Sequence, residues 1–278
     1  MLIFPNPTLD RQIEMALAED IGPGDITTDN LIPVETQSKG KIWAKENGVI
    51  AGLPVVERVY EMLGGVRTTP KKEDGELVDR GETLLTLEGN TRSILKGERL
   101  ALNFLQRLSG IATQTARVVE KTAGYNIRVV DTRKTTPLWR TLEKYAVVQG
   151  GGHNHRLGLY DSVLIKDNHI EAVGSVKEAV KRAKEKVGHT VKVEVEVKKR
   201  AQIDEALEAG ADIILLDNMS PEEMSDAVKK IGKKAIVEAS GNITADNANE
   251  IAKTGVDVIS LGALTHSVRA LDISLDLF

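Results

Sequence analysis

The chain of 278 residues is 41% hydrophobic and 28% charged, typical of a globular protein with room for one large domain or two smaller ones. It contains no cysteine, so disulfides, thiolate metal sites and a cysteine nucleophile are excluded. A net charge of −4 and an aromatic content of 3% argue against nucleic-acid binding. The sequence shows neither an apolar run of about 18 residues nor a secretory signal, so we expect a cytoplasmic protein that does not bind membranes.

The first part of the chain predicts two helices and several short strands separated by turn residues. The helices are expected at residues 8–19 and 54–63, and the strands at residues 39–53, as a hairpin around Asn47 and Gly48, and at residues 75–88. Thr8 is the expected N-cap of the first helix, and Gly64 is the expected end of the second. We expect residues 1–108 to form an α+β sandwich domain with mainly antiparallel strands.

A longer helical pattern covers residues 91–122. Its apolar side chains recur at helical spacing from Ile94 to Val118. Gly110 interrupts this stripe, and glycine inside a helix costs about 1 kcal/mol relative to alanine. We therefore expect two helices that meet at Gly110.

After Gly124 short apolar runs alternate with amphipathic helical segments. The runs, each interpreted as a strand, cover residues 127–130, 162–165, 191–197, 212–216, 235–237 and 256–261. Strands that alternate with helices pair in parallel through right-handed crossovers. Because no Gly-rich dinucleotide turn follows the first run, we expect residues 109–266 to form an open, TIM-like α/β barrel rather than a doubly wound sheet. Residues 267–278 predict a last strand that rejoins the N-terminal sheet.

Cationic residues occur where the first two of these strands end. Arg133 and Lys134 follow the first strand, Lys166 ends the second, and Arg156 lies in the connection between them. Barrel enzymes build their active sites from the carboxyl ends of the strands, and burial disfavours an unpaired cation. We expect these four side chains to converge on a small anionic ligand.

Acidic residues follow the next strands. Glu196 and Asp217 lie at successive strand ends, where two carboxylates suit Mg²⁺ or the hydroxyls of a sugar. The alternative is that they neutralise the nearby cations. Glu194 faces the same side of its strand as Glu196, so the pattern does not distinguish the two.

Small residues follow the last two strands, where barrel proteins commonly bind phosphate through backbone N–H groups. They are Ser240, Gly241 and Asn242 after one strand and Leu261, Gly262 and Ala263 after the other. His266 either faces this phosphate site or caps the last helix.

The remaining polar residues near the cations predict no metal site. His153 and His155 face the same way in an extended chain, but no third zinc ligand is evident beside them. Arg140 and Lys144 fall in a helical segment, which suits surface positions or internal ion pairs.

The motifs that carry this chemistry resemble those of the quinolinate phosphoribosyltransferase family. The most specific are DTRKTTP at residues 131–137, GGGHNHR at residues 150–156 and LIKDNHI at residues 164–170, and similar segments run along nearly the whole chain. The resemblance implies an α+β N-terminal domain followed by an open α/β barrel. It also implies a homodimer or larger assembly in which Arg99 completes the neighbouring subunit's site.

The same resemblance implies a role for each motif residue. Quinolinate would be bound by Arg133, Lys134, His155, Arg156 and Lys166, of which Lys134 and Lys166 would also lie near the phosphoribosyl donor. Thr132 would be a further substrate-binding residue, and the two small-residue loops would bind the 5-phosphate. Glu196 and Asp217 would act at the ribose hydroxyls and Mg²⁺, which the pyrophosphate of the donor mainly carries. Lys134, Lys166, Glu196 and Asp217 are the expected catalytic residues. The implied reaction joins quinolinate to phosphoribosyl pyrophosphate and releases pyrophosphate and CO₂, giving nicotinate mononucleotide for NAD biosynthesis.

Three alternatives stay open at this point. Lys166 could form a Schiff base in an aldolase or isomerase built on a similar barrel. The chain could instead be the relative of this family that is associated with molybdenum transport. It could also be a binding protein for phosphorylated ligands without catalytic activity.

Overall fold

The computed structural model describes residues 6–278, which form two compact units. The first unit contains the described residues up to Gln114, together with Val148–Gly151 and Val268–Phe278. The second unit contains Thr115–Val147 and Gly152–Ser267. The boundary falls inside helix α4 (Thr91–Lys121). No helix in the described part of the chain is long and apolar enough to cross a membrane.

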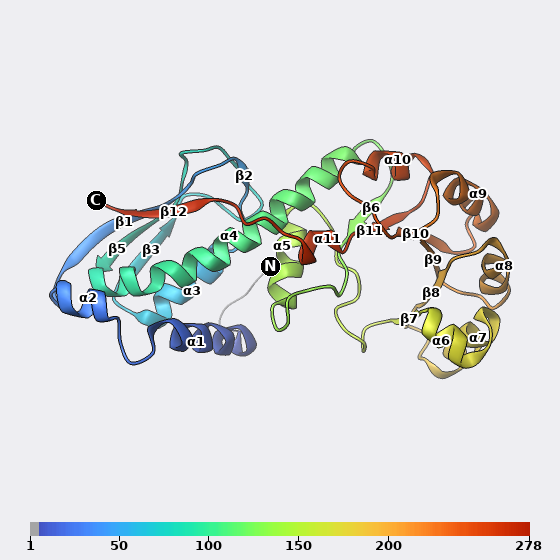
Figure 1. Ribbon diagram of the computed structural model, residues 1–278, viewed down its shortest axis with the longest axis horizontal. Helices are drawn as coiled ribbons and strands as arrows, with labels where there is room; N and C mark the ends of the chain where they lie inside the picture. The colour runs from blue at the N-terminus through green and yellow to red at the C-terminus, as the bar shows by residue number, and fades with distance from the viewer. Residues whose placement is uncertain (1–5) are drawn as a thin grey trace. The chain divides into compact units, whose positions relative to one another are not determined.

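An antiparallel sheet with the strand order β12-β1-β5-β3 forms the centre of the first unit. The strands are β1 (Gln37–Ala44), β3 (Val66–Pro70), β5 (Thr83–Asn90) and β12 (Ile273–Leu277), and the helices before α4 are α1 (Pro7–Ile21), α2 (Ile26–Leu31) and α3 (Leu53–Leu63). The C-terminal strand pairs with β1, with Gly40 opposite Leu277, which confirms that the tail rejoins the N-terminal sheet (Figure 1).

Two local predictions in this unit are wrong. The hairpin expected at residues 39–53 does not form, because β1 pairs with β5 and β12, while β2 (Gly48–Val49) pairs with β4 (Leu77–Val78). Contacts distant in sequence decide this pairing, since the Val49 amide donates to Thr113 Oγ1 on α4 at 2.9 Å. The first helix is capped by the side chain of Asn6 rather than by Thr8. The second expected helix does end at Gly64.

Helix α4 is continuous, so the break expected at Gly110 is also wrong. A Cβ atom at this position would lie 2.3 Å from the carbonyl oxygen of Arg269. Glycine is therefore needed here because a neighbouring segment passes close to the helix backbone, and its cost in helix propensity is offset by packing.

The second unit is built on a parallel sheet with the strand order β6-β11-β10-β9-β8-β7. The strands are β6 (Arg128–Val130), β7 (Val163–Ile165), β8 (Val193–Val197), β9 (Ile213–Asp217), β10 (Ile236–Ser240) and β11 (Val258–Ser260). The first and second strands of the unit, β6 and β7, form its two edges, so the barrel is open between them. This arrangement confirms the predicted open α/β barrel.

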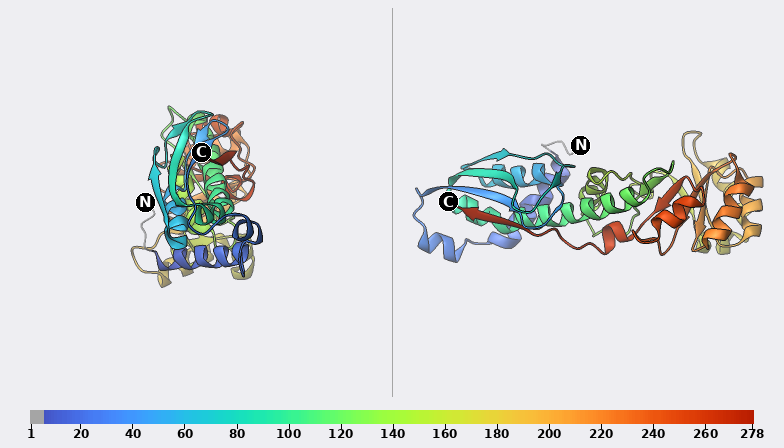
Figure 2. Two further views of the ribbon diagram at one scale, coloured as in Figure 1. Left: turned by 90° about the vertical axis from the view of Figure 1, so that its left-hand side faces the viewer. Right: turned by 90° about the horizontal axis from the view of Figure 1, so that it is seen from above.

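The helices of this unit follow its strands, and the row of α7, α8 and α9 lies along the outer side of the curved sheet (Figures 1 and 2). They are α5 (Arg140–Gln149), α6 (Asp167–Val173), α7 (Val176–Lys186), α8 (Arg200–Glu208), α9 (Pro221–Ile231), α10 (Ala248–Lys253) and α11 (Ala263–His266). Local signals set their ends. In α9 the Ser220 hydroxyl accepts from the Glu223 amide and the Glu223 carboxylate accepts from the Ser220 amide, a reciprocal capping box.

The strand register places polar side chains in two rows on the inner face of the sheet. Leu215 is the partner of both Glu196 and Glu238. One step toward the carboxyl ends, Ser240 is the partner of both Asp217 and Ser260. Since paired residues of neighbouring strands face the same side, these side chains share one wall.

Candidate active site

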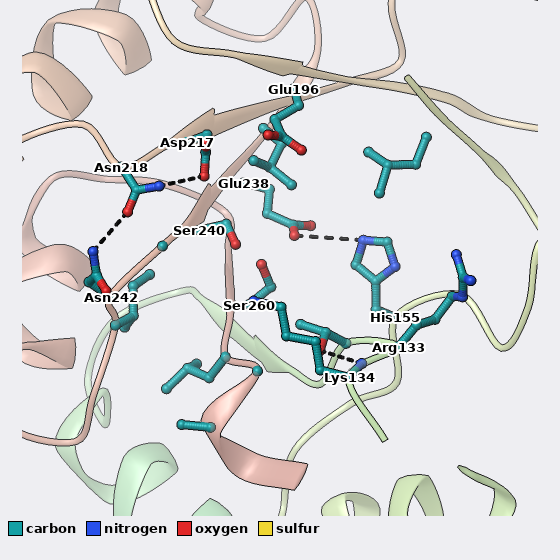
Figure 3. A pocket seen from close by; sticks show the side chains of 18 of the residues that line it. Arg133, Lys134, His155, Glu196, Asp217, Asn218, Glu238, Ser240, Asn242 and Ser260 are labelled. Carbon is teal, nitrogen blue, oxygen red and sulfur yellow. Dashed lines mark hydrogen bonds and ion pairs between the residues drawn. The ribbon is translucent and has the colours of Figure 1, made fainter. Parts of the chain in front are cut away.

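A cavity of about 750 Å³ lies at the carboxyl ends of the barrel strands (Figure 3). The residues predicted to form the site and found in its lining are Thr132, Arg133, Lys134, His155, Arg156, Lys166, Glu196, Asp217, Ser240, Gly241, Asn242, Leu261, Gly262, Ala263 and His266. They come from every strand end of the sheet and from the connection between β6 and β7. Arg99 is the exception, since it is an exposed residue of α4 in the first unit and does not line this cavity.

The cationic side of the cavity carries donors that its protein neighbours leave unused. Arg133 Nε is buried and has no hydrogen-bond partner among the described residues. Arg156 is held by a bond from Nη1 to the carbonyl oxygen of Ser162 at 3.0 Å. Burial and the nearby charge of Arg133 lower the pKa of Arg156. An anion bound here would accept a hydrogen bond from the buried Arg133 Nε and would reduce the repulsion between the two guanidinium groups.

The acidic side supports both interpretations made from the sequence. Glu196 Oε2 lies 3.4 Å from Lys166 Nζ, and Asp217 Oδ2 lies 3.9 Å from Lys198 Nζ, so both acids do neutralise cations. Both also line the cavity. Burial raises the pKa of Glu196, and the charge of Asp217 adds to this effect while Lys166 opposes it. A further positive charge near these two carboxylates would therefore be stabilised.

A buried ion pair supports the cationic side from behind. Lys144 Nζ donates to Asp131 Oδ1 and also to the carbonyl oxygen of His155, the latter at 3.0 Å. Asp131 Oδ1 in turn accepts from the His155 amide at 2.9 Å. Of the two alternatives left open for Lys144, a surface position or an internal ion pair, the structure shows the internal ion pair. Arg140 has a similar supporting role, since it donates to Thr135 Oγ1 and to the carbonyl oxygen of Leu157.

His155 is placed differently from the other predicted ligand-binding residues. Its Nδ1 accepts from the Arg156 amide at 2.7 Å, and its Nε2 lies 3.2 Å from Glu194 Oε2 and 3.6 Å from Glu238 Oε1. Burial opposes a charge on this ring, but Glu194 and Glu238 outweigh it and raise the pKa of His155. Both ring nitrogens therefore have protein partners, and the residue also lines the cavity.

The contacts of His155 distinguish the two glutamates of β8, Glu194 and Glu196, which the sequence pattern could not separate. Glu194 is 2% exposed and packs against His155, whereas Glu196 lines the cavity. Together with His155, Glu194 and Glu238 offer three possible ligand atoms that lie within 4.8 Å of one another, a group that the sequence analysis did not predict. His153 is not part of this group and instead extends the sheet through a backbone bridge to Val130.

The loops expected to bind phosphate are shaped by glycine and asparagine. Gly241 has φ +98°, and a Cβ atom there would lie 2.3 Å from Asn218 Oδ1. Asn218 and Asn242 adopt positive φ values of 55° and 52°, and the Asn242 side chain donates to Asn218 Oδ1 at 3.0 Å. At the second loop, a Cβ atom on Gly262 would lie 2.8 Å from Lys134 Cδ. Both loops therefore bring backbone close to the cavity.

The sequence analysis did not predict seven of the residues that line the cavity, which are the polar residues Asn218, Glu238, Thr244 and Ser260 and the apolar residues Leu164, Leu215 and Ile243. Asn218 directly follows Asp217, and Ser260 ends the last barrel strand, so their positions at strand ends were a usable signal. Glu238 lies two residues before Ser240 on the same face of β10, which predicts an inward side chain. His266 lines the cavity, while its Nδ1 lies 2.7 Å from Ser267 Oγ.

An open α/β barrel with cations, carboxylates and two phosphate-type loops around one cavity defines an enzyme of the barrel class that acts on anionic, phosphorylated substrates. Comparisons with known proteins agree with this class. The family models for the quinolinate phosphoribosyl transferase N-terminal and C-terminal domains match residues 25–109 and 111–276. The chain therefore belongs to the quinolinate phosphoribosyltransferase family.

Individual relatives extend this similarity over almost the whole chain. The chain is 49% identical to a probable nicotinate-nucleotide pyrophosphorylase (carboxylating) of Methanocaldococcus jannaschii, with 95% of each chain covered. It is 46% identical to the probable enzyme of the same name from Bacillus subtilis, covering 93% of this chain and 89% of that one. The crystal structure of NadC from Streptococcus pyogenes matches with a TM-score of 0.96 at 42% identity, covering 100% of this chain and 99% of that one.

Proposed function

We propose that this chain transfers the phosphoribosyl group of phosphoribosyl pyrophosphate to quinolinate and releases pyrophosphate and CO₂, giving nicotinate mononucleotide. The observation that carries the proposal is the division of one cavity into a cationic side and a side with carboxylates and phosphate-type loops. A dicarboxylate acceptor suits the first side and a phosphorylated sugar suits the second. This is the activity that the names of the family and its relatives describe.

The cationic side would orient the acceptor. Quinolinate carries two adjacent carboxylates beside its ring nitrogen. Arg133 offers a buried, unused Nε donor, and guanidinium groups bind carboxylates through paired hydrogen bonds. Holding the dicarboxylate in this way turns the ring nitrogen toward the ribose, so binding energy is used for positioning. Lys134 and Lys166 add point charges at the cavity wall.

The acidic side would stabilise the charge that develops on the sugar. As the bond from ribose C1 to pyrophosphate lengthens, positive charge grows on C1 and the ring oxygen. Glu196 and Asp217 are preorganised carboxylates in a partly buried wall, where electrostatic stabilisation is stronger than in water. The same two acids suit the ribose hydroxyls, and the Gly241 and Gly262 loops suit the 5-phosphate.

We propose that Mg²⁺ enters with the pyrophosphate of the donor rather than as a resident ion. Glu196 and Asp217 offer oxygen ligands of the kind that Mg²⁺ prefers, but each already lies near a lysine. They fit contact with the waters of a substrate-bound ion. When bound, the ion would neutralise charge on the leaving pyrophosphate.

The acceptor step needs no nucleophilic residue. The quinolinate nitrogen attacks C1, and the ring becomes cationic. The positive charge of this nitrogen then stabilises the electron pair that stays on the adjacent C2 when the bond from C2 to its carboxylate breaks. A Schiff-base mechanism at Lys166 is not favoured, since its ammonium group pairs with Glu196 and the family is one of phosphoribosyltransferases.

We further propose that Arg99 acts in the site of a neighbouring subunit. Arg99 is exposed on α4, and in the described chain it does not line the cavity that contains the other predicted residues. A homodimer or larger assembly would bring it to a second chain's cavity. Location in the cytoplasm likewise stays a prediction.

The test is product formation from quinolinate and phosphoribosyl pyrophosphate with Mg²⁺, with nicotinate as a parallel acceptor. Turnover of quinolinate with equal amounts of pyrophosphate and CO₂ supports the proposal. Arg133→Ala and Lys166→Ala should lose at least about 10²-fold in kcat/KM because they remove substrate contacts. Lys166→Ala should also unfold at the wild-type temperature, because the Lys166 side chain is exposed. Normal activity in these variants, or turnover of nicotinate alone, would contradict it.

A further inference from the structure

The reaction needs one proton at C2 of the pyridine ring, and none of the residues discussed so far has been assigned as its donor. When CO₂ departs, the electron pair of the broken bond stays on C2 of the pyridine ring, and that carbon must gain a proton to complete the product. We propose that Glu238 is the acid that protonates C2. This inference rests on the function proposed above, and it assigns a catalytic role to a residue that the family resemblance left without one.

The position of Glu238 on β10 carries the first part of the argument. Leu215 on β9 is the register partner of both Glu238 and Glu196, so Glu238 belongs to the same inner wall as the acid assigned to the ribose. Figure 3 shows the Glu238 side chain between Glu196 and Asp217 on one side and His155 and Arg133 on the other. The new bond from ring nitrogen to ribose C1 must form where these two sides meet. Since C2 is bonded to that nitrogen, it lies at the same junction.

The surroundings of Glu238 leave one carboxyl oxygen available. The residue is 3% exposed and lines the cavity. Its Oε1 has no hydrogen-bond partner within the described chain, although it forms a longer ion-pair contact of 3.6 Å with His155 Nε2. The Ser260 side chain bonds to the carboxyl group from β11. A buried oxygen without a hydrogen bond, on a residue that lines a substrate cavity, is suited to a contact made only when substrate is bound.

The charged groups around Glu238 favour its protonated form near neutral pH. Burial raises the pKa of Glu238 to about 7, with a further contribution from Glu194 on β8, while His155 and Ser260 oppose the shift. Lys144 lies behind His155 and is itself bonded to the His155 carbonyl oxygen. A neutral acid also avoids repulsion of the quinolinate dicarboxylate, which an ionised Glu238 at the same place would cause.

The step balances without any further reactant. As the bond between C2 and its carboxylate carbon breaks, its electron pair forms a new bond from C2 to the proton of the Glu238 carboxyl group. The O–H electrons stay on the Glu238 oxygen, and CO₂ leaves in the same step. Glu238 is left as a carboxylate, which regains a proton from water once CO₂ and nicotinate mononucleotide have left.

Glu238→Gln tests the proposal, because the amide keeps the size of the side chain and can still bond to Ser260 but has no acidic proton. Single-turnover reactions would measure pyrophosphate and CO₂ separately, with mass spectrometry for a nucleotide heavier than nicotinate mononucleotide by one CO₂. We expect CO₂ release to fall by about 10²-fold or more, while pyrophosphate release continues and the heavier nucleotide accumulates. Wild-type CO₂ release should slow as pH rises through about 7, and this dependence should be absent in the variant.

Glu194→Gln is the matched control, since Glu194 is equally buried and contacts the same His155 but does not line the cavity. It should release pyrophosphate and CO₂ in equal amounts. Two results would overturn the proposal: wild-type rates of CO₂ release in Glu238→Gln, or an equal decrease of both products, which would indicate a positioning role alone. Failure of the wild-type protein to release pyrophosphate from quinolinate would instead refute the proposed function.

Discussion

Replacing Lys144 by methionine tests whether the buried ion pair holds the cationic side of the cavity in place. Lys144 is 1% exposed and Asp131 is fully buried. The substitution keeps much of the packing volume but removes the ammonium group that bonds to Asp131 and to the His155 carbonyl oxygen. The Asp131 carboxylate would then be a buried charge without its cationic partner.

Loss of one member of a buried pair costs about 3–5 kcal/mol, in contrast to about 0–1 kcal/mol for an exposed pair. For a unit of this size the larger cost corresponds to a decrease of about 6–20 °C in unfolding temperature. Burial already raises the pKa of Asp131 and Lys144 opposes this effect, so without the lysine the carboxyl group takes up a proton more readily. Such uptake would keep the cost at the lower end of the range near neutral pH.

Calorimetry and circular dichroism would measure the unfolding temperature of Lys144→Met. Lys181→Met is the control, because Lys181 is 64% exposed and its change should stay within about 0.5 kcal/mol. The double variant Asp131→Asn/Lys144→Met should recover part of the loss, since neither charge is then buried alone. A cost below about 1 kcal/mol for Lys144→Met, or a double variant with strictly additive losses, would refute the reasoning.

Three further predictions follow from the site. Gly241→Ala should raise the KM for phosphoribosyl pyrophosphate about tenfold or more, because the new Cβ meets the Asn218 side chain and the backbone has a positive φ. Gly188→Ala is the control, since a Cβ atom there meets no neighbouring atom and should leave the KM unchanged. Equal KM values for the two variants would contradict this prediction. The stabilising contribution of Glu238 is fully present below its unfolded pKa and is lost as pH rises through its folded pKa of about 7. The free energy of unfolding of Glu238→Gln, relative to that of the wild type, should therefore increase by up to about 3 kcal/mol between pH 4.5 and 7 in denaturant titrations. A difference in free energy of unfolding that does not change with pH would argue against the raised pKa. Mixing inactive Arg99→Ala and Lys166→Ala subunits should restore roughly a quarter of wild-type activity if each site is shared between two chains. Half of the dimers then contain one subunit of each kind, and each of these has one intact site of two. No recovery of activity would indicate that Arg99 acts elsewhere.

The barrel was predictable because its signals are local and repeated. Alternating apolar runs and amphipathic segments after Gly124 indicate strands and helices directly, and parallel strands align their carboxyl ends at one edge. Polar residues at those ends could therefore be grouped before the register was known. The tail strand was predictable for the same reason, from its alternating pattern at residues 272–278.

The errors came from positions whose environment is set by distant segments. Gly110 interrupts a helical pattern, yet the helix continues, and the glycine accommodates the backbone of Arg269. Asn47 and Gly48 are typical of a hairpin turn, but the strands on either side find other partners. In both cases tertiary packing outweighs a local preference worth about 1 kcal/mol.

The sequence by itself determined the open barrel, the family resemblance and most of the residues that line the cavity, because residue types at strand ends are readable without coordinates. Only the tertiary structure decided what each polar side chain contacts. It separated Glu196, which faces the cavity, from Glu194, which packs against His155. It also showed Glu238 beside that histidine with a carboxyl oxygen that has no hydrogen-bond partner in the described chain. These assignments depend on strand register and side-chain direction across four segments of the chain, and a linear pattern does not contain either.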